Sequence, residues 1–483
     1  MYVLLQNHCP PYDSVDYAYA VRTGVGLFHP HHLLYNFCGR GLFVFVSRFD
    51  NVDAIRLLAW ANALVTAALA WIVCLVLFEH TGRRLPALVG ALLCAFSNGI
   101  WHMATSVEVY PVMLLCQVAT LYLLVRTDEP SLATVIGAGL LTGLGMLFHQ
   151  TGIFFVLVAA YVLWRQRAPL FRIAAYGVVA GVTCGVPYLL AAGSEGIRTP
   201  RGFLDWLLAY THSAQYASGQ WGGGYRLKSL PLDLQGFTES WIRPERLYDL
   251  FYPGRGGPTV WDLLSAIPLV GFVGLLVYLL VSVHKRAAAP RSIFRAALLV
   301  WVALYGAFTF WWEPRSFEFW LLIAPPLSML FGLAIDRLDL TQRRYRLASV
   351  LLIAALFLGN LFTAIGPAAQ PSRNYVAAVT HELGAAQIAD GDVVLSDESA
   401  FAPYARYYLG KSIEVRSLAQ YRAVADGLAG TRQIFLLEAD LVESADEQQR
   451  SYAGDVASAT VIGDYETRGR RWKIWRLTRA PRQ

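Results

Sequence analysis

The chain has 483 residues, of which 56% are hydrophobic and 15% charged, and its mean hydropathy is +0.42. These values exclude an ordinary soluble globular protein, whose composition is more polar. The net charge of +6 does not indicate a nucleic-acid partner, because the arginines collect in short loops between apolar runs. The composition predicts a polytopic α-helical membrane protein.

Residues 1–56 carry two acidic side chains ahead of a helix-like run. Asp13 and Asp16 are three residues apart, so a helical turn would place both carboxylates on one face. The alternative interpretation is a pair of helix-capping or loop carboxylates. The run 31–49 is a poor span because it follows Pro30 and contains Arg40, and we expect a helix lying on the outer membrane interface.

Apolar runs recur from residue 57 to residue 366 and define the membrane domain. Runs of roughly 17 to 23 residues are long enough to cross a hydrocarbon core of about 30 Å. We predict ten spans, at 57–79, 86–104, 107–126, 132–148, 150–164, 170–192, 261–283, 294–312, 317–336 and 346–366. The segment 193–260 is rich in Trp, Gly and Pro and is expected to be a loop with short helices.

Basic residues in alternate short loops predict the orientation of the spans. They are Arg83, Arg84, Arg126, Arg165, Arg167, Arg172, Lys285, Arg286, Arg291, Arg295, Arg337, Arg343, Arg344 and Arg346. Basic loops face the cytoplasm. Residues 1–56, the loop 193–260 and the tail 367–483 are therefore expected on the outer, periplasmic face of a bacterial inner membrane. An outer N-terminus also leads us to expect a further span upstream, which would make eleven.

The tail 367–483 has a different periodicity and is predicted to be a small soluble α/β domain. Short strand-like runs alternate with helix-like ones. The expected strands are 392–396, 412–416, 433–438, 459–465 and 472–477, with helices near 403–409 and 419–429. No glycine-rich phosphate-binding motif occurs in this tail, so it is assigned no chemistry.

Several polar residues lie at the predicted outer ends of the spans. Glu108 follows a short outer turn, where it is either solvated or functional. His102 and His149 lie at similar depth, where a single histidine is more often a hydrogen-bonded interface residue than a ligand. Arg315 is the only basic residue in a short outer loop. It would either pair with Glu313 or Glu318, or bind a phosphate through its guanidinium group.

Five short motifs together resemble a known enzyme family. They are Asp13-Ser14-Val15-Asp16, His29-Pro30 through Tyr35, Phe96-Ser97 with Trp101, Glu108-Val109-Tyr110, and Gly143 through His149. This order resembles GT-C glycosyltransferases similar to protein O-mannosyltransferases. The family's first motif has Gly and Glu where this chain has Val15 and Asp16, and its second has Pro-Gly in place of His31-His32. Acidity survives the first change, while loop geometry and acceptor fit are altered.

The resemblance implies transfer of a sugar, with mannose as the first expectation, from a polyprenyl-phosphate donor to a hydroxyl of a protein or glycan acceptor. It implies inversion at the anomeric carbon, with Asp13 as general base and Asp16 positioning it. Glu108, His29, His102, His149, Tyr110 and Arg315 are the expected substrate-binding residues. No cofactor is required; Asp16 and Glu108 would be the ligands of an optional Mg²⁺ or Mn²⁺ ion.

Two other functions compete with the glycosyltransferase interpretation. A lipid or solute transporter would carry ionisable residues in mid-span and paired, interrupted helices. The predicted spans are nearly free of charge and show no obvious internal repeat. A non-catalytic membrane scaffold, with the tail as a binding module, is the second alternative. Neither explains why acidic residues collect on one predicted face.

Overall fold

The computed structural model of the chain describes residues 1–208, 230–243, 260–284, 292–396, 398–417, 433–438, 440, 459–467 and 470–477. Contacts divide these residues into two compact units. The helical unit comprises residues 1–6 and the described residues between 26 and 366. The sheet unit comprises residues 7–25 and the described residues from 367 onward. The N-terminal acidic stretch is thus grouped with the C-terminal tail.

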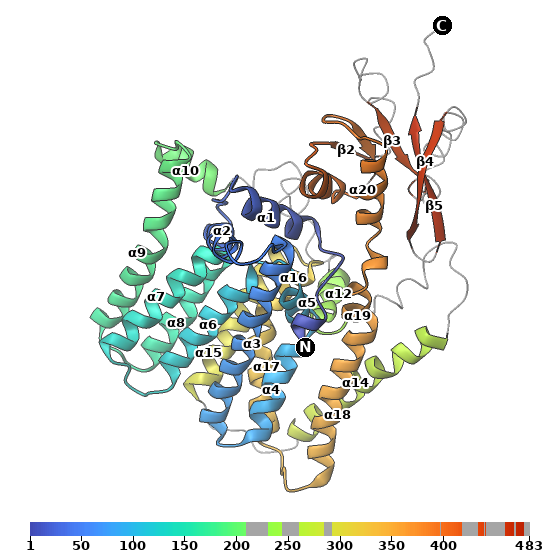
Figure 1. The fold of residues 1–483 in the computed structure, drawn as a ribbon. Coiled ribbons are helices and arrows are strands. Elements are labelled where there is room, and N and C mark those ends of the chain that lie inside the picture. Colours follow the sequence, from blue (N-terminus) through green and yellow to red (C-terminus); the bar gives the residue numbers. More distant parts are fainter. Residues whose placement is uncertain are drawn as a thin grey trace. The chain divides into compact units, whose positions relative to one another are not determined.

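The helical unit consists of helices and short turns of helix (Figure 1). They are η1 (Tyr2–Leu4), α2 (Tyr35–Val46), α3 (Ala54–Thr81), α4 (Arg84–Phe96), α5 (Asn98–Thr105), α6 (Tyr110–Val125), α7 (Leu132–Phe148), η2 (Gln150–Ile153), α8 (Phe154–Arg165), α9 (Leu170–Ser194), α10 (Pro200–Leu207), α12 (Leu230–Trp241), α14 (Val260–His284), α15 (Ile293–Trp312), α16 (Phe317–Trp320), η5 (Leu321–Ile323), α17 (Ala324–Ile335), α18 (Arg343–Asn360) and η6 (Leu361–Ile365).

The structure confirms a polytopic membrane protein. Each predicted span coincides with a helix or with consecutive helices. Within the described ranges, five stretches are long and apolar enough to cross a membrane: Ala54–Thr81, Leu170–Ser194, Ile293–Trp312, Phe317–Ile335 and Arg343–Ala368. Four further apolar helices are shorter, namely Tyr110–Val125, Leu132–Phe148, Gln150–Arg165 and Ala266–Ser282. The twelve-residue helix α2 lies within the run 31–49 and is too short to cross.

The prediction of one continuous span at 86–104 is wrong. Helices α4 and α5 are separated at Ser97 and bent by 61° relative to each other. Ser97 has an extended ψ of 140°, and its hydroxyl donates to the carbonyl of Cys94. A Ser-Asn-Gly sequence at 97–99 competes with helical hydrogen bonding, which explains the break. The segment is therefore a broken span or a re-entrant pair.

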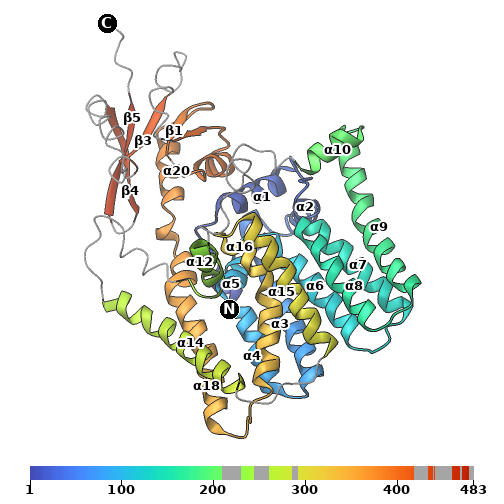
Figure 2. The same cartoon turned by 180° about the vertical axis from the view of Figure 1, so that it is seen from behind.

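Small residues allow close packing between helices α7 and α9, which run side by side in Figures 1 and 2. A Cβ atom added at Gly143 would lie 2.6 Å from Thr183 Cβ and 2.8 Å from the carbonyl oxygen of Ala180. Glycine at this position therefore lets the two backbones approach, as is common in membrane helix pairs. A hydroxyl bond from Tyr176 to Thr142, 3.0 Å long, adds a polar contact between the same helices.

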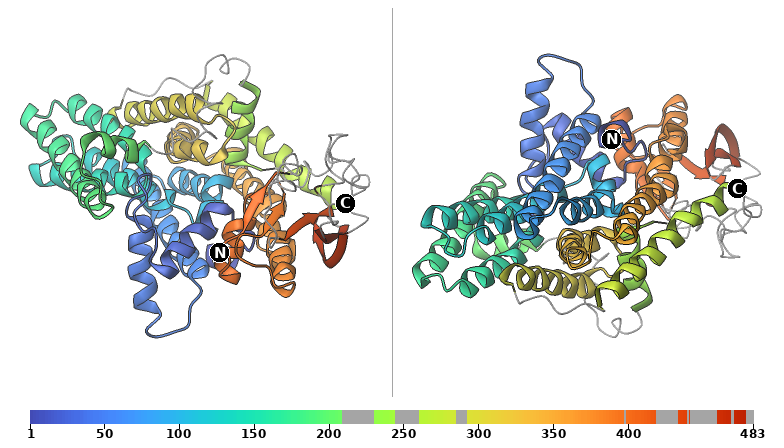
Figure 3. Two further views of the ribbon diagram at one scale, coloured as in Figure 1. Left: turned by 90° about the horizontal axis from the view of Figure 1, so that it is seen from above. Right: turned by 90° about the horizontal axis from the view of Figure 1, so that it is seen from below.

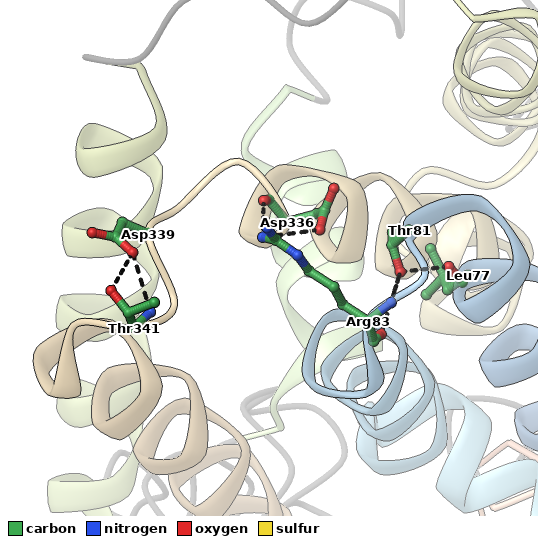
Figure 4. Close-up of polar contacts among 6 residues, drawn as sticks. All are labelled: Leu77, Thr81, Arg83, Asp336, Asp339 and Thr341. Atoms are coloured by element: carbon green, nitrogen blue, oxygen red, sulfur yellow. Dashed lines mark hydrogen bonds and ion pairs between the residues drawn. The ribbon is translucent and has the colours of Figure 1, made fainter.

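An ion pair joins the start of α4 to the end of α17. Arg83 Nη1 lies 3.5 Å from Asp336 Oδ1 and donates a 3.1 Å hydrogen bond to the Asp336 carbonyl (Figure 4). Arg83 thus satisfies an orphan carbonyl at the end of α17. Beyond this loop, α18 packs against α14, as seen from below in Figure 3, through buried residues such as Leu279, Tyr345 and Leu352.

Helix α12 is attached to the bundle mainly through its backbone. Asn98 Nδ2 donates to the Glu239 carbonyl over 2.8 Å. Asn360 Nδ2 donates to the carbonyls of Phe96 and Trp241, each over 2.8 Å. Just beyond the helix, Thr363 Oγ1 donates to the Arg243 carbonyl over 2.6 Å. These buried amide and hydroxyl groups hold α12 at the α4–α5 break and at the π-helical turn η6.

The sheet unit contains a five-stranded sheet of order β2-β1-β3-β5-β4. Its elements are α1 (Tyr12–Thr23), η7 (Pro371–Arg373), α20 (Tyr375–Ala385), β1 (Val393–Leu395), α21 (Phe401–Tyr404), η8 (Ala405–Leu409), β2 (Glu414–Arg416), β3 (Ile434–Leu437), β4 (Ala459–Thr467) and β5 (Arg470–Leu477). Strand β1 pairs in parallel with β2 and β3, and β5 is antiparallel to β3 and β4. The predicted α/β tail and its five strands are confirmed; the expected helix 419–429 lies outside the described residues.

Candidate active site

The two N-terminal carboxylates lie on helix α1, as their spacing predicts. Asp13 is in the first turn, where a carboxylate is favoured by the helix dipole. Burial among protein atoms and the neighbouring Asp16 carboxylate raise the pKa of Asp13 to about 6. Burial also raises the pKa of Asp16, but Arg406 and the Tyr12 hydroxyl oppose the increase. The two carboxylates therefore differ in their ease of ionisation.

Within the sheet unit, helix α1 contacts α21 and η8 from the C-terminal part of the chain. Arg406 Nη1 lies 3.2 Å from Asp16 Oδ1. The Arg22 guanidinium lies 4.0 Å from the centre of the Tyr407 ring, which is a cation–π contact. The π-helical turn η8 supplies both Arg406 and Tyr407. The sequence gives no local sign of this pairing, because Asp16 and Arg406 are 390 positions apart.

In the helical unit, the histidine-rich motif is fixed on the turn after α7. The NH of Gln150 donates to the His31 carbonyl over 2.9 Å, and the Gln150 side chain donates to the Pro30 carbonyl over 2.7 Å. The rings of His29 and His32 stack with centroids 4.5 Å apart. Burial lowers the pKa of His29, and burial with the neighbouring His29 ring lowers the pKa of His31 to about 4. Burial therefore favours the neutral form of both rings.

His149 is held by a hydrogen-bond chain that crosses the bundle. Its Nδ1 lies 2.8 Å from the Thr151 hydroxyl and 3.3 Å from the Thr151 NH. Tyr305 donates to the Thr151 carbonyl over 2.9 Å and accepts from Gln117 over 2.7 Å. The Tyr110 ring lies 4.6 Å from the His149 ring. The motifs at 108–110 and 143–149 therefore meet at one place.

Glu108 is buried in the turn between α5 and α6, with 4% of its surface exposed. Asn62 on α3 holds this turn: its Nδ2 donates to the carbonyls of Ser106 and Glu108 over 2.9 and 2.7 Å. The same nitrogen lies 3.3 Å from the Tyr35 hydroxyl. Asn62 was missed from the sequence, although an amide inside an apolar span is itself a signal of a functional or structural role.

Two further predicted residues, His102 and Arg315, lie near helix α16. His102 contacts the Phe317 ring edge to face, with centroids 5.6 Å apart. The Arg243 guanidinium lies 5.4 Å from the centre of the same ring. Arg315 is exposed in the loop before α16. Besides Arg315, Arg243 is thus a candidate phosphate-binding cation near α16. The sequence did not single it out, because it lies in the long loop 193–260.

The predicted site residues are thus divided between the units. Asp13 and Asp16 belong to the sheet unit, and the other six belong to the helical unit. Of those six, the structure brings Tyr110 and His149 into ring contact, and the motif of His29 docks on the turn that follows His149. Among the residues that the structure describes, no group of three or more His, Cys, Asp or Glu is arranged to hold a metal ion.

Comparisons with known proteins find one family model and several solved structures that are similar to this chain. Residues 41–237 match the model of glycosyltransferase family 87. No curated protein sequence matches the chain significantly. Among solved structures, the chain is similar to ArnT from Cupriavidus metallidurans in the apo state, with a TM-score of 0.62 and 11% identity over 98% of this chain and 95% of ArnT.

Two further structures share the fold. ArnT from the same organism bound to undecaprenyl phosphate gives a TM-score of 0.60 at 11% identity, over 98% of this chain and 95% of that one. The Archaeoglobus fulgidus oligosaccharyltransferase in the apo form gives 0.52 at 14% identity, over 96% of this chain and 70% of that one. The chain thus shares the fold of these membrane-enzyme structures, and its residues 41–237 are similar to glycosyltransferase family 87.

Proposed function

We propose that the protein transfers a sugar from a polyprenyl-phosphate donor to an acceptor hydroxyl on the periplasmic face of a bacterial inner membrane. The observation that carries the proposal is the carboxylate pair on α1, in which Asp16 pairs with Arg406 and burial raises the pKa of Asp13. A similar structure was solved with undecaprenyl phosphate, a lipid of the proposed class. Mannose is the first sugar to test, and a protein or glycan is the proposed acceptor.

In the proposed mechanism, Asp13 accepts the proton of the acceptor hydroxyl while its oxygen attacks the anomeric carbon. The bond from that carbon to the lipid phosphate breaks, and the configuration inverts. A general base works best when its pKa is close to the working pH, because it must be ionised yet still basic. A pKa of about 6 meets both conditions near neutral pH. Asp16, paired with Arg406, orients the base or the acceptor.

The pH profile tests the role of Asp13 directly. Because only the carboxylate form accepts a proton, we expect kcat/KM to rise with pH through an apparent pKa of about 6. Replacing Asp16 by Asn removes the like charge, which should move this rise toward lower pH. Initial rates from pH 5 to 8 would show both effects. A profile flat across pH 5 to 7 in the wild-type protein would exclude Asp13 as the titrating base.

The lipid phosphate is proposed to lie against Arg315, whose exposed guanidinium suits a bidentate phosphate contact. We expect Arg315→Ala to raise the donor KM by about tenfold or more, since a charge-assisted hydrogen bond contributes roughly 1.5–3 kcal/mol. The turnover number at saturating donor should change little. Arg243→Ala is the comparison. A higher donor KM in that variant, with no change in Arg315→Ala, would place the phosphate at the Arg243 guanidinium instead.

Purified protein assayed with a panel of polyprenyl-phosphate sugars tests the proposed function as a whole. The panel should include mannose, glucose, galactose and an aminopentose, each with a short peptide and a glycan acceptor. Transfer from one lipid phosphate sugar, with release of polyprenyl phosphate, is the expected result. Transfer from nucleotide sugars and from none of the lipid-linked donors would contradict the proposal.

A further inference from the structure

Within the sheet unit, residues of the C-terminal tail contact helix α1 and the segment before it. Before α1, the Asn374 amide donates to the His8 carbonyl over 2.6 Å, and the Tyr404 hydroxyl donates to the Pro10 carbonyl over 3.0 Å. The NH of His8 donates to the Ala368 carbonyl over 2.8 Å. The segment leading into α1 is therefore hydrogen-bonded to the tail before the helix begins.

The helix itself is held at two further positions by charged side chains. Near its start, Arg406 pairs with Asp16 and lies over the Tyr19 ring at 5.6 Å. Near its end, Arg22 lies over Tyr407 and donates to the Tyr407 carbonyl over 2.5 Å. Contacts at both ends fix the rotation of α1 about its axis as well as its position. That rotation decides where the Asp13 carboxylate points.

Arg406 also makes the two carboxylates unequal. It forms its ion pair with Asp16, one helical turn from Asp13. Besides Arg406, the titratable groups on α21 and η8 are the phenols of Tyr404, Tyr407 and Tyr408, which are uncharged at pH 7. On α1 itself, the Tyr12 hydroxyl bonds to Asp16. The positive charge beside the pair therefore comes from the tail.

We infer that Arg406 is a positioning residue for sugar transfer: it keeps Asp16 ionised and fixes α1, which leaves Asp13 as the carboxylate that accepts the proton. The inference rests on the proposed function for its catalytic part. It gives the C-terminal tail, to which the sequence assigns no chemistry, a definite role. Arg406 need not touch the substrate, because it acts through Asp16 and the helix.

The experiment compares Arg406→Gln and Arg406→Lys with Arg416→Gln in the full-length protein. Arg416 is a matched control because it is also in the sheet unit and pairs with a local carboxylate, that of Glu414. Hydrogen exchange of a peptide covering residues 12–23 is measured without substrate. We expect faster exchange in Arg406→Gln, partial recovery in Arg406→Lys and no change in Arg416→Gln.

The second readout is the pH profile of transfer. Without Arg406, Asp16 ionises less readily, so its negative charge raises the pKa of Asp13 less. The rise of kcat/KM should therefore shift toward lower pH in Arg406→Gln, as in Asp16→Asn, while transfer at pH 8 falls on the order of tenfold because α1 is no longer fixed. Arg406→Lys should restore the wild-type profile.

The outcomes separate the inference from the proposed function. Unchanged exchange in Arg406→Gln overturns the inference, and so does faster exchange with an unshifted pH profile, because the tail would then be only a structural support. If the wild-type protein transfers no sugar from any lipid donor, the proposed function is wrong. In that case the exchange of residues 12–23 still decides whether Arg406 fixes the helix.

Discussion

Asp13→Asn is expected to lower sugar transfer by about 10² to 10⁴, the usual contribution of a general base. Asparagine keeps the size of the side chain and its hydrogen bonding, but it cannot accept a proton. The variant should therefore insert, fold and bind donor normally while its turnover number collapses. The measurement is kcat with saturating donor and acceptor, so that any change in affinity is removed from the comparison.

Asp16→Asn is the matched comparison on the same helix. It should have a milder effect if Asp16 only orients the base, and Asp13 should then titrate at lower pH. Near-normal turnover in Asp13→Asn would transfer the role of base to Asp16, and after it to Glu108. Normal turnover in both α1 variants, together with an unchanged donor KM in Arg315→Ala, would exclude all three residues from the proposed mechanism.

Asn62→Leu is expected to produce the largest loss of stability among single changes near the site. It removes the donor for two carbonyls of the buried Ser106–Glu108 turn. Each hydrogen bond lost in this buried turn costs roughly 0.5–1.5 kcal/mol in the free energy of unfolding. Thermal unfolding of the purified protein should show a clearly lower Tm, and transfer should fall because the turn carries Glu108.

Thr66→Val provides a control one turn further along α3. Thr66 is equally buried, and within the described part of the chain its hydroxyl has no hydrogen-bond partner. Replacing it by valine keeps the shape and removes a polar group that makes no bond, so Tm should stay constant or rise. If Asn62→Leu and Thr66→Val melt together, the amide contacts seen at Asn62 contribute nothing to stability.

The helices and strands could be predicted from the sequence because each depends on a local pattern. Apolar runs gave the membrane helices, and short β-rich runs gave all five strands of the tail. The break at Ser97 was missed because the surrounding run stays apolar, even though Ser, Asn and Gly stand together there. A hydropathy average over the run hides these three residues, but their backbone preferences interrupt the helix.

Contacts between residues far apart in the sequence could not be predicted, because the local pattern around one residue does not identify its partner. The order of the sheet places β5 beside β3, although β4 follows β3 along the chain. The contact of Asp16 with Arg406 belongs to the same class. By contrast, Asn62 and Gln117 were visible as amides inside apolar spans, and only their bonding partners required the structure.

The manner in which α12 is held has a consequence for sequence divergence. Asn98, Asn360 and Thr363 bind main-chain carbonyls of residues 239–243, so their contacts do not depend on which side chains that segment carries. Substitutions on α12 leave these three hydrogen bonds available, while packing restricts Gly236, where a Cβ would lie 2.5 Å from the Pro314 carbonyl oxygen, and Phe237, whose ring contacts Trp320. Over evolutionary time, this loop helix can change its surface while the three residues that hold it cannot change freely.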